Sequence, residues 1–238
     1  MAENPHAREE LKADDSTEEE QAADKQQDIQ GPEVPEHWDK LALNLAQEHT
    51  ASRRKGDREP LTGYLPRYQS IFLDAYRYFR TATEQELALS YAAEWILDNY
   101  HILKRVLRQI EENLPADYYR QLPKLDAGVS QGYPRVYDIA RTIVIREDAH
   151  LDTARVIRFV HAYEAKTPLT MGELWALPIM LRLCILQAMV PSLHRIVKSE
   201  FRQDETNLPV LDLKNQSGDD EVIANAFISL RALAAEDW

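Results

Sequence analysis

Two acidic residues one helical turn apart, Glu94 and Asp98, are the first pair in this sequence that could carry out catalysis. Paired carboxylates can act as general acid and general base when they face one site. The same spacing suits a solvated helix face, on which a carboxylate pairs with a basic side chain such as Arg105. Because the sequence places no nucleophile or further acid–base group with them, we interpret the pair as part of a solvated face.

Arg182 lies at the centre of the apolar segment 174–193. A buried guanidinium needs a partner, because an uncompensated buried charge is strongly destabilising. A structural ion pair is the interpretation we favour, and an exposed position on a face that meets another domain is the alternative. For an ion pair, we expect Arg182→Met to be tolerated far better than loss of the acidic partner alone. The candidate partners are Glu94, Asp98 and Glu173.

Tyrosines gather in and around two loops, at Tyr118, Tyr119, Tyr133 and Tyr137. Tyrosine is amphipathic, so such a cluster suits a protein interface or a sugar surface, and loops often carry function. Aromatic loops also hold the helices of a bundle together, and we favour this structural role.

Trp95 and Asn99 lie beside the apolar stripe of a long helix. A partly buried amide needs hydrogen-bond partners, so we expect Asn99 to tie down a neighbouring loop. The candidate interaction or structural positions are therefore Trp95, Asn99, Tyr118, Tyr119, Tyr133 and Arg182.

Motifs for catalysis and cofactor binding are missing from the sequence. It has no G-x-G-x-x-G or G-x-x-x-x-G-K-[ST] pattern for nucleotide phosphates and no G-x-S-x-G elbow. No Cys/His set has metal-ligand spacing, and we interpret His161 and His194 as hydrogen-bonded helix residues. The single cysteine, Cys184, lies in an apolar run and is expected to be buried. We predict no catalytic, cofactor-binding or metal-binding residue.

The net charge of −12 belongs mostly to the N-terminus. Residues 1–36 hold 12 acidic and 3 basic side chains, and the remainder holds 28 acidic and 25 basic ones. A nearly balanced body has no general electrostatic footprint for nucleic acid. Residues 1–35 have almost nothing large and apolar to bury, so we predict a disordered acidic tail, solvating or used for interaction.

The remaining sequence reads as helices joined by short loops. A capping-box pattern at Thr83 and Glu86 predicts the start of a long helix that ends at Asn113, before Pro115. Asp152 predicts the cap of another helix, and Thr170 with Glu173 repeats the capping-box pattern. The expected helices are about 36–51, 66–80, 84–113, 134–147, 153–165, 171–201 and 221–238.

The segment 174–193 has the length of a membrane span, but Arg182 at its centre and two prolines argue for a helix buried in protein. The apolar periodicity of the last helix still continues at residue 238, so we expect the chain to be truncated there. The prediction is an all-α, multi-helix bundle with a disordered acidic N-terminal tail. Its parts are the tail at 1–35, a first helix and basic linker at 36–63, and a helical domain at 64–238.

Several sequence blocks resemble one family in order and spacing. The blocks are AAEWILDN (92–99), LPADYYRQLPKL (114–125), GYPRVYDIA (132–140), TPLTMGELWALPIMLRL (167–183) and NAFISLRALAAEDW (225–238). Over roughly residues 84–238 the chain resembles the N-terminal part of the bacterial cyclic β-1,2-glucan synthases. That family consists of very large inner-membrane proteins that join a UDP-glucose-dependent glycosyltransferase to a region resembling glycoside phosphorylases.

The resemblance implies a helical scaffolding or interaction region on the cytoplasmic side of the inner membrane. Its partners would be downstream transferase and membrane domains, and no direct membrane span is expected in this chain. Neither the transferase Asp-x-Asp motif nor Q-x-x-R-W is present in a suitable context, so the resemblance implies no catalytic residue here. The alternative is an independent helical adaptor that binds another protein through its tyrosine-rich loops.

Overall fold

A computed structural model describes residues 36–52, 58–85, 90–197, 208–213 and 218–235. The acidic tail expected at 1–35 lies outside the described residues, as do 236–238. Residues 36–238 form one compact unit. The all-α prediction is confirmed.

The elements are α1 (Glu36–Glu48), β1 (Ala51–Ser52), η1 (Leu61–Tyr64), α2 (Leu65–Glu84), α3 (Tyr91–Asn113), α4 (Ala116–Gln121), β2 (Lys124–Leu125), α5 (Arg135–Arg146), α6 (Thr153–Glu164), α7 (Met171–Val197) and α8 (Asp219–Ala235).

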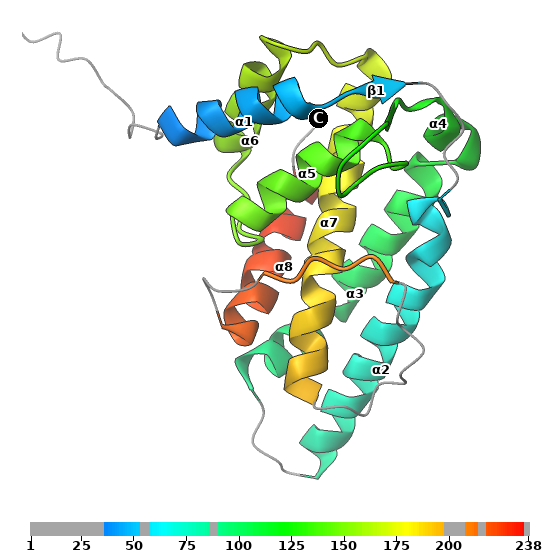
Figure 1. Cartoon of the computed structure of the whole chain (residues 1–238). Coiled ribbons are helices and arrows are strands. Elements are labelled where there is room, and N and C mark those ends of the chain that lie inside the picture. The colour runs from blue at the N-terminus through cyan, green and yellow to red at the C-terminus, as the bar shows by residue number, and fades with distance from the viewer. Residues whose placement is uncertain (1–35, 53–57, 86–89, 198–207, 214–217, 236–238) are drawn as a thin grey trace, which may run out of the picture. The chain divides into compact units, whose positions relative to one another are not determined.

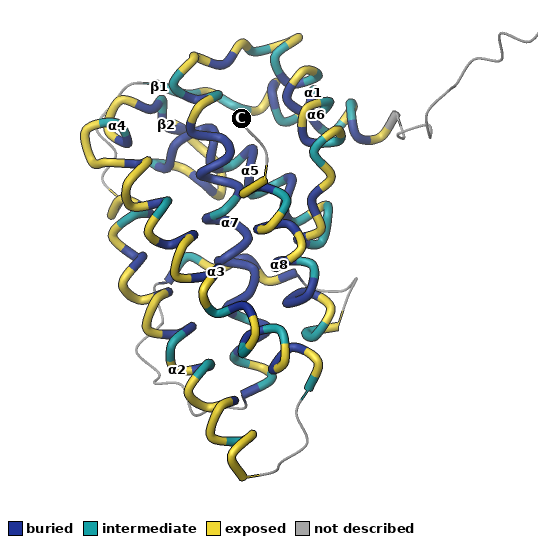
Figure 2. The backbone as a smooth tube through the Cα atoms, turned by 180° about the vertical axis from the view of Figure 1, so that it is seen from behind, coloured by how far each residue is buried: buried dark blue, intermediate teal, exposed yellow. Residues whose placement is uncertain are grey.

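Helix α7 is the centre of the bundle. It packs against α2, α3, α5 and α8, and it runs between them in Figure 1. The helix is long and apolar enough to cross a membrane, but 89% of its most apolar window is buried inside the protein. In Figure 2 its path is almost entirely dark blue. A helix that is apolar on all sides is buried on all sides, and Cys184 is buried with it, as expected.

Helices α2 and α3 pack together. Aromatic residues that recur at steps of three and four form a stripe along α2, and most of them are buried, among them Tyr68, Phe72 and Phe79. Near the surface, the rings of Tyr76 and Tyr100 stack with centroids 4.5 Å apart. This stripe is therefore core rather than a platform for a ligand.

The junction between α2 and α3 corrects the capping-box prediction. Thr83 lies inside α2, where its hydroxyl donates to the carbonyl of Phe79 at 2.9 Å. Helix α3 begins instead after Ser90, whose side chain accepts from the backbone N–H of Ala93. Ser90 is the N-cap of α3 because its short hydroxyl side chain and extended backbone suit the N-cap position. Glu86 lies outside the described residues.

The other predicted caps are confirmed. Asp152 accepts from the backbone N–H of Arg155 at 2.9 Å and starts α6. Thr170 and Glu173 form a reciprocal capping box at the start of α7, in which Glu173 accepts from the Thr170 N–H at 2.9 Å. The segment after Asn113, expected to be loop, holds the short helix α4.

A strap of chain, residues 208–213, crosses α7 where a proline interrupts its hydrogen bonding. Pro191 has no N–H, so the carbonyl of Gln187 has no donor within the helix. The backbone N–H of Leu211 donates to that carbonyl at 3.1 Å. The side chains of Leu208, Leu211 and Leu213 are buried and hold the strap in place.

Helices α1 and α6 form a separate layer. They pack on each other and make only slight contact with the other described helices. Both views show them side by side, at the end of the bundle where α7 begins (Figures 1 and 2). Strands β1 and β2 pair antiparallel next to this layer, with Ala51 opposite Leu125.

Candidate functional site

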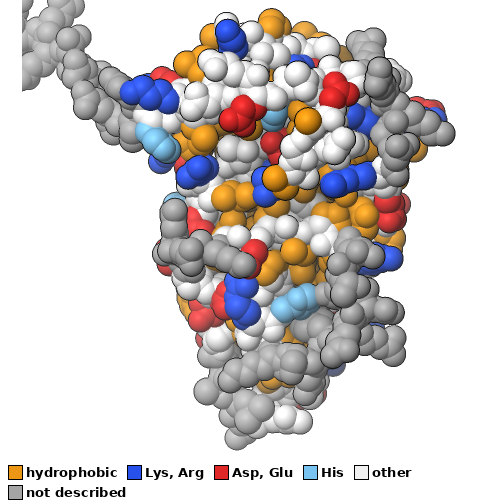
Figure 3. Space-filling view, viewed as in Figure 1, with side chains coloured by type: hydrophobic (Ala, Val, Ile, Leu, Met, Phe, Trp, Pro, Cys, Tyr) orange, Lys and Arg blue, Asp and Glu red, His pale blue; other side chains and the backbone are white. Residues whose placement is uncertain are grey.

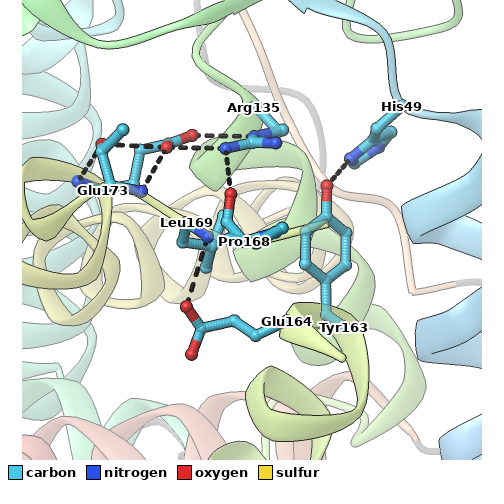
Figure 4. A network of polar contacts seen from close by, with 8 residues as sticks. His49, Arg135, Tyr163, Glu164, Pro168, Leu169 and Glu173 are labelled. Atoms are coloured by element: carbon cyan, nitrogen blue, oxygen red, sulfur yellow. Dashed lines mark hydrogen bonds and ion pairs between the residues drawn. The ribbon is translucent and has the colours of Figure 1, made fainter. Parts of the chain in front are cut away.

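A buried ion pair joins α5 to the start of α7. Arg135 Nε donates to Glu173 Oε1 at 2.8 Å, and its Nη2 donates to Oε2 at 2.7 Å. Both side chains are buried, at 9% and 0% relative exposure. Arg135 also donates to the carbonyl of Pro168 at 3.2 Å, and Glu173 accepts from Thr170 (Figure 4). Burial opposes the charge of Arg135, but the contacts with Glu173 outweigh it and raise the pKa of Arg135.

A second buried group lies beside this pair and contains His49, which follows α1. Its Nδ1 is 2.8 Å from the hydroxyl of Tyr163, and its Nε2 is 3.1 Å from Asp138 Oδ2. In the neutral tautomer with Nε2–H, His49 donates to Asp138 and Tyr163 donates to His49. In the protonated form both ring nitrogens donate and the tyrosine hydroxyl accepts, so either state is satisfied. Figure 4 shows His49 and Tyr163 pointing toward each other.

The charges around Asp138 keep it ionised. Burial raises the pKa of this carboxyl, but hydrogen bonds from His49 and Ser130 and the nearby charges of His49 and Arg141 lower it more. Burial raises the pKa of Tyr163 to about 12, so its hydroxyl stays protonated. The guanidinium of Arg135 lies 6.0 Å from the Tyr163 ring and links the two groups.

Together these residues form the polar hub, defined as His49, Ser130, Arg135, Asp138, Tyr163, Thr170 and Glu173. Tyr163, His49 and Asp138 lie in the order of hydroxyl, imidazole and carboxylate that a nucleophilic triad also uses. Burial raises the pKa of the Tyr163 hydroxyl to about 12, which makes it harder to ionise, and Ser130 donates to Asp138 rather than to His49. Among the described residues there is no group of His, Cys, Asp and Glu that could hold a metal ion. The hydrogen bonds of the hub connect the residue after α1 to α5 and α6, and its ion pair connects α5 to α7.

A smaller polar cluster lies between α2, α5 and α7. Tyr137 donates to Gln187 Oε1 at 2.9 Å, and Gln187 Nε2 donates to the Tyr68 hydroxyl at 3.1 Å. The Tyr68 hydroxyl in turn donates to the carbonyl of Pro209 in the strap. Burial raises the pKa of Tyr68 and that of Tyr137, so both remain neutral donors. Burial also raises the pKa of Cys184, which keeps the thiol protonated.

The predicted tyrosines point inward and join elements. Tyr118 donates to the carbonyl of Gly172 and fastens α4 to α7. The Tyr119 hydroxyl, on a buried ring, accepts from the N–H of Leu61 at 3.4 Å. Tyr133 is buried against Tyr137, and the guanidinium of Arg58 lies 4.8 Å from its ring centre. These contacts agree with a structural role.

Trp95 and Asn99 are brought together by α8, rather than by the loop that we expected. Asn99 donates to the Trp95 carbonyl at 2.9 Å and accepts from Arg231. The guanidinium of Arg231 lies 5.5 Å from the centre of the Trp95 ring, which also contacts the rings of Phe227 and Tyr91. The long side chain of Arg231 reaches both Trp95 and Asn99, so the hydrogen-bond partner of the Asn99 amide lies on α8.

The structure also corrects the expected partners of Arg182. Glu173 is engaged with Arg135, and the side chains of Glu94 and Asp98 are exposed. Arg182 is half-buried and donates to the carbonyl of Leu233, near the end of α8. Burial lowers the pKa of Arg182. A helix C-terminus carries partial negative charge, so a carbonyl there can take the place of an acidic partner.

The outer face agrees with the near balance of charge in the sequence. In Figure 3 the acidic and basic side chains of the described residues are interspersed with apolar ones. On α3, Arg108 lies 3.7 Å from Glu112 across one turn. These exposed pairs fit the interpretation of Glu94 and Asp98 as members of a solvated face.

Sequence reasoning missed most of the hub. It named Glu173, though as a partner of Arg182, and it did not name His49, Arg135 or Asp138. Two signals were available: Glu173 is the acid of a capping box, and Arg135 directly follows the proline that starts α5. No local signal links His49 to Asp138, because 89 positions separate them.

Comparison with known proteins gives one relevant similarity. The chain is 27% identical over 165 residues to the cyclic β-(1,2)-glucan synthase NdvB of Rhizobium meliloti (strain 1021). The matched segment is 69% of this chain but 6% of that protein, so the chain spans a small part of its relative's length. No family model matches the chain.

Proposed function

We propose that this chain is a helical scaffolding region of a glycosyltransferase related to the cyclic β-1,2-glucan synthases. The observation that carries the proposal is the 165-residue similarity to NdvB. The geometry supports a scaffold because the buried polar groups of the hub bond to one another across four elements. In this role the chain holds or positions other parts of the enzyme, and the transfer of glucose takes place elsewhere.

The partners that we propose are the transferase and membrane domains of such an enzyme, at the cytoplasmic side of the inner membrane. Most of the apolar segment 174–193 is buried within the chain and is not available to a partner. Within α7, the first turn offers two large apolar side chains to a partner: Met171 and Trp175 are 61% and 69% exposed. They are one turn apart, on the same line along α7 as Arg182.

An exposed tryptophan beside a methionine is typical of an interface, because these side chains supply large contact areas. The alternative function, an adaptor that binds through its tyrosine-rich loops, has less support. The tyrosines on which it rested are buried or half-buried in contacts within the chain.

The experiment that tests the proposal uses the Rhizobium meliloti synthase with its matching region replaced by this chain. Met171→Ala with Trp175→Ala should lower glucan production from UDP-glucose by isolated membranes at equal protein level. Tyr78→Ala, at a residue of α2 that is 40% exposed, is the matched control and should have no effect. Equal activity of all three proteins would exclude this face as the contact with the transferase.

A further inference from the structure

Among the helices, α1 packs mainly on α6, and its C-terminal end is joined to the rest by His49, by the Thr167 bond to the Ala46 carbonyl and by the pairing of β1 with β2. Among the described helices only α6 packs extensively on it, and α6 in turn packs extensively on no other described helix. The layer seen in Figures 1 and 2 is thus a helix pair that is held to the rest by polar contacts at its end. The main polar contact is His49, which bonds to Asp138 of α5 and to Tyr163 of α6.

Helix α1 presents a short and specific set of groups to α6. Trp38 is 4% exposed, its ring centre lies 5.1 Å from that of Phe159, and its Nε1–H donates to the carbonyl of Arg155 at 2.9 Å. The next residue, Asp39, accepts two hydrogen bonds from Arg158, at 2.9 and 2.8 Å. Small residues follow on the same face at one-turn intervals, Ala42 and Ala46, both buried.

The face of α6 beneath α1 is apolar and continuous. Its inward side chains are Val156, Phe159, Val160 and Tyr163, which are all buried. A continuous apolar helix face beside a basic residue, Arg158, has the chemistry that receives an amphipathic helix. An isolated helix of 13 residues is marginal in water, so α1 needs this groove to remain helical.

We propose that the α6 face is a helix-docking groove and that α1 is its exchangeable occupant. The partner that the groove fits is an amphipathic helix with the chemistry of α1. It carries a tryptophan anchor, an acidic residue directly after it, and alanines one and two turns later. When α1 leaves, Phe159 and Val160 are uncovered for such a helix. The start of the described chain thereby controls access to this surface.

The first test is hydrogen–deuterium exchange on the full chain. Because α1 has one neighbouring helix whereas α7 has four, α1 amides should exchange at least about tenfold faster than α7 amides through a local opening. Equal protection of α1 and α7 would overturn the proposal, because it would make α1 part of the global folding unit.

The second test measures binding of a synthetic peptide of residues 36–52 to the full chain. The Trp38→Ala chain, checked for native helicity, should bind the peptide at least about tenfold more tightly than the wild-type chain, whose groove is filled. A peptide with Trp38→Ala should not bind. Equal binding of both peptides, or binding of neither to the Trp38→Ala chain, would overturn the proposal.

A charge swap keeps the test decisive if the Trp38→Ala chain fails to fold. Arg158→Asp in the chain places two carboxylates together, so it should favour the departure of α1 by about two- to fivefold and weaken binding of the native peptide to the same extent. A peptide with Asp39→Arg should restore binding to this chain by about two- to fivefold, which is the range for a partly exposed ion pair. If the Asp39→Arg peptide binds the Arg158→Asp chain no more tightly than the native peptide does, the α6 face does not recognise the residue at position 39 and the proposal fails.

Discussion

Arg135 and Glu173, 38 residues apart, form a two-bond ion pair that is almost completely buried. The pair joins the first turn of α5 to the first turn of α7, and Glu173 also caps α7 through Thr170. The carboxylate of Glu173 therefore pairs with the buried guanidinium of Arg135 and also accepts a hydrogen bond at the N-terminus of α7. Removing either partner leaves the other charged and buried.

Glu173→Gln should lower the free energy of unfolding by about 3–5 kcal/mol, the range for a broken buried ion pair. Replacing both residues with Met should cost much less than the sum of the two single changes, because no charge is then stranded. Urea unfolding of the single and double variants measures both quantities. Arg80→Ala, at an exposed pair, is the control and should cost less than about 1 kcal/mol. Additive single and double effects would contradict a coupled pair.

Asp138 should make stability depend on pH in the acid range. Its pKa in the folded protein lies below the ordinary value of 3.8, so between these two values the unfolded chain binds more protons. The stabilisation is fully present above the unfolded pKa and is lost as the pH falls through the folded pKa. From pH 5 to pH 3, wild type should lose more free energy of unfolding than Asp138→Asn. Parallel curves from urea unfolding would show that Asp138 does not carry this dependence.

Arg182→Met should change the free energy of unfolding by less than about 1 kcal/mol. The guanidinium contributes a hydrogen bond to the end of α8, worth about 0.3–1 kcal/mol for a cation at a helix C-terminus. Burial of the charge opposes that gain. Thermal melts that compare Arg182→Met with Glu173→Met should show a far larger loss for Glu173, whose partner is Arg135. Equal losses would show that Arg182 is as strongly coupled as the buried pair.

Tyr68→Phe should destabilise the protein by about 1–3 kcal/mol. The change removes the donor to the Pro209 carbonyl and the acceptor for Gln187, and both groups are left unpaired. Hydrogen exchange should show faster exchange of the Leu211 amide, because the strap loses the bond next to it and keeps the Leu211 bond and the Arg195–Asp212 pair. Tyr78→Phe on the exposed side of α2 is the matched control, with no expected change. Unchanged protection of Leu211 would mean that the Tyr68 bond does not anchor the strap.

Local signals predicted much of the fold, because they act within one or two turns. The caps at Asp152 and Thr170 and the apolar stripes of α2 and α3 need only neighbouring residues. The start of α3 was placed too early because two hydroxyl residues, Thr83 and Ser90, could both cap a helix. Only the folded chain shows Thr83 bonded within α2.

The candidate site was much less predictable, because its contacts join distant positions. Arg135 and Glu173 carry opposite charges, yet Arg182 was an equally valid partner for Glu173 by sequence. Packing decides between the two, since α5 brings Arg135 to the start of α7 while Arg182 lies more than two turns further along. The tyrosines, for which the sequence left a structural and an interface role open, make contacts within the chain.

The most direct test of the central claim is glucan synthesis by the chimeric Rhizobium meliloti synthase. We compare the intact enzyme, a deletion of the region matched by this chain, and a chimera that carries this chain in its place. The account predicts that the deletion loses synthesis from UDP-glucose and that the chimera regains a measurable part of it, while the purified chain alone makes no glucan. A chimera no more active than the deletion at equal membrane level, or glucan made by the chain alone, would contradict it.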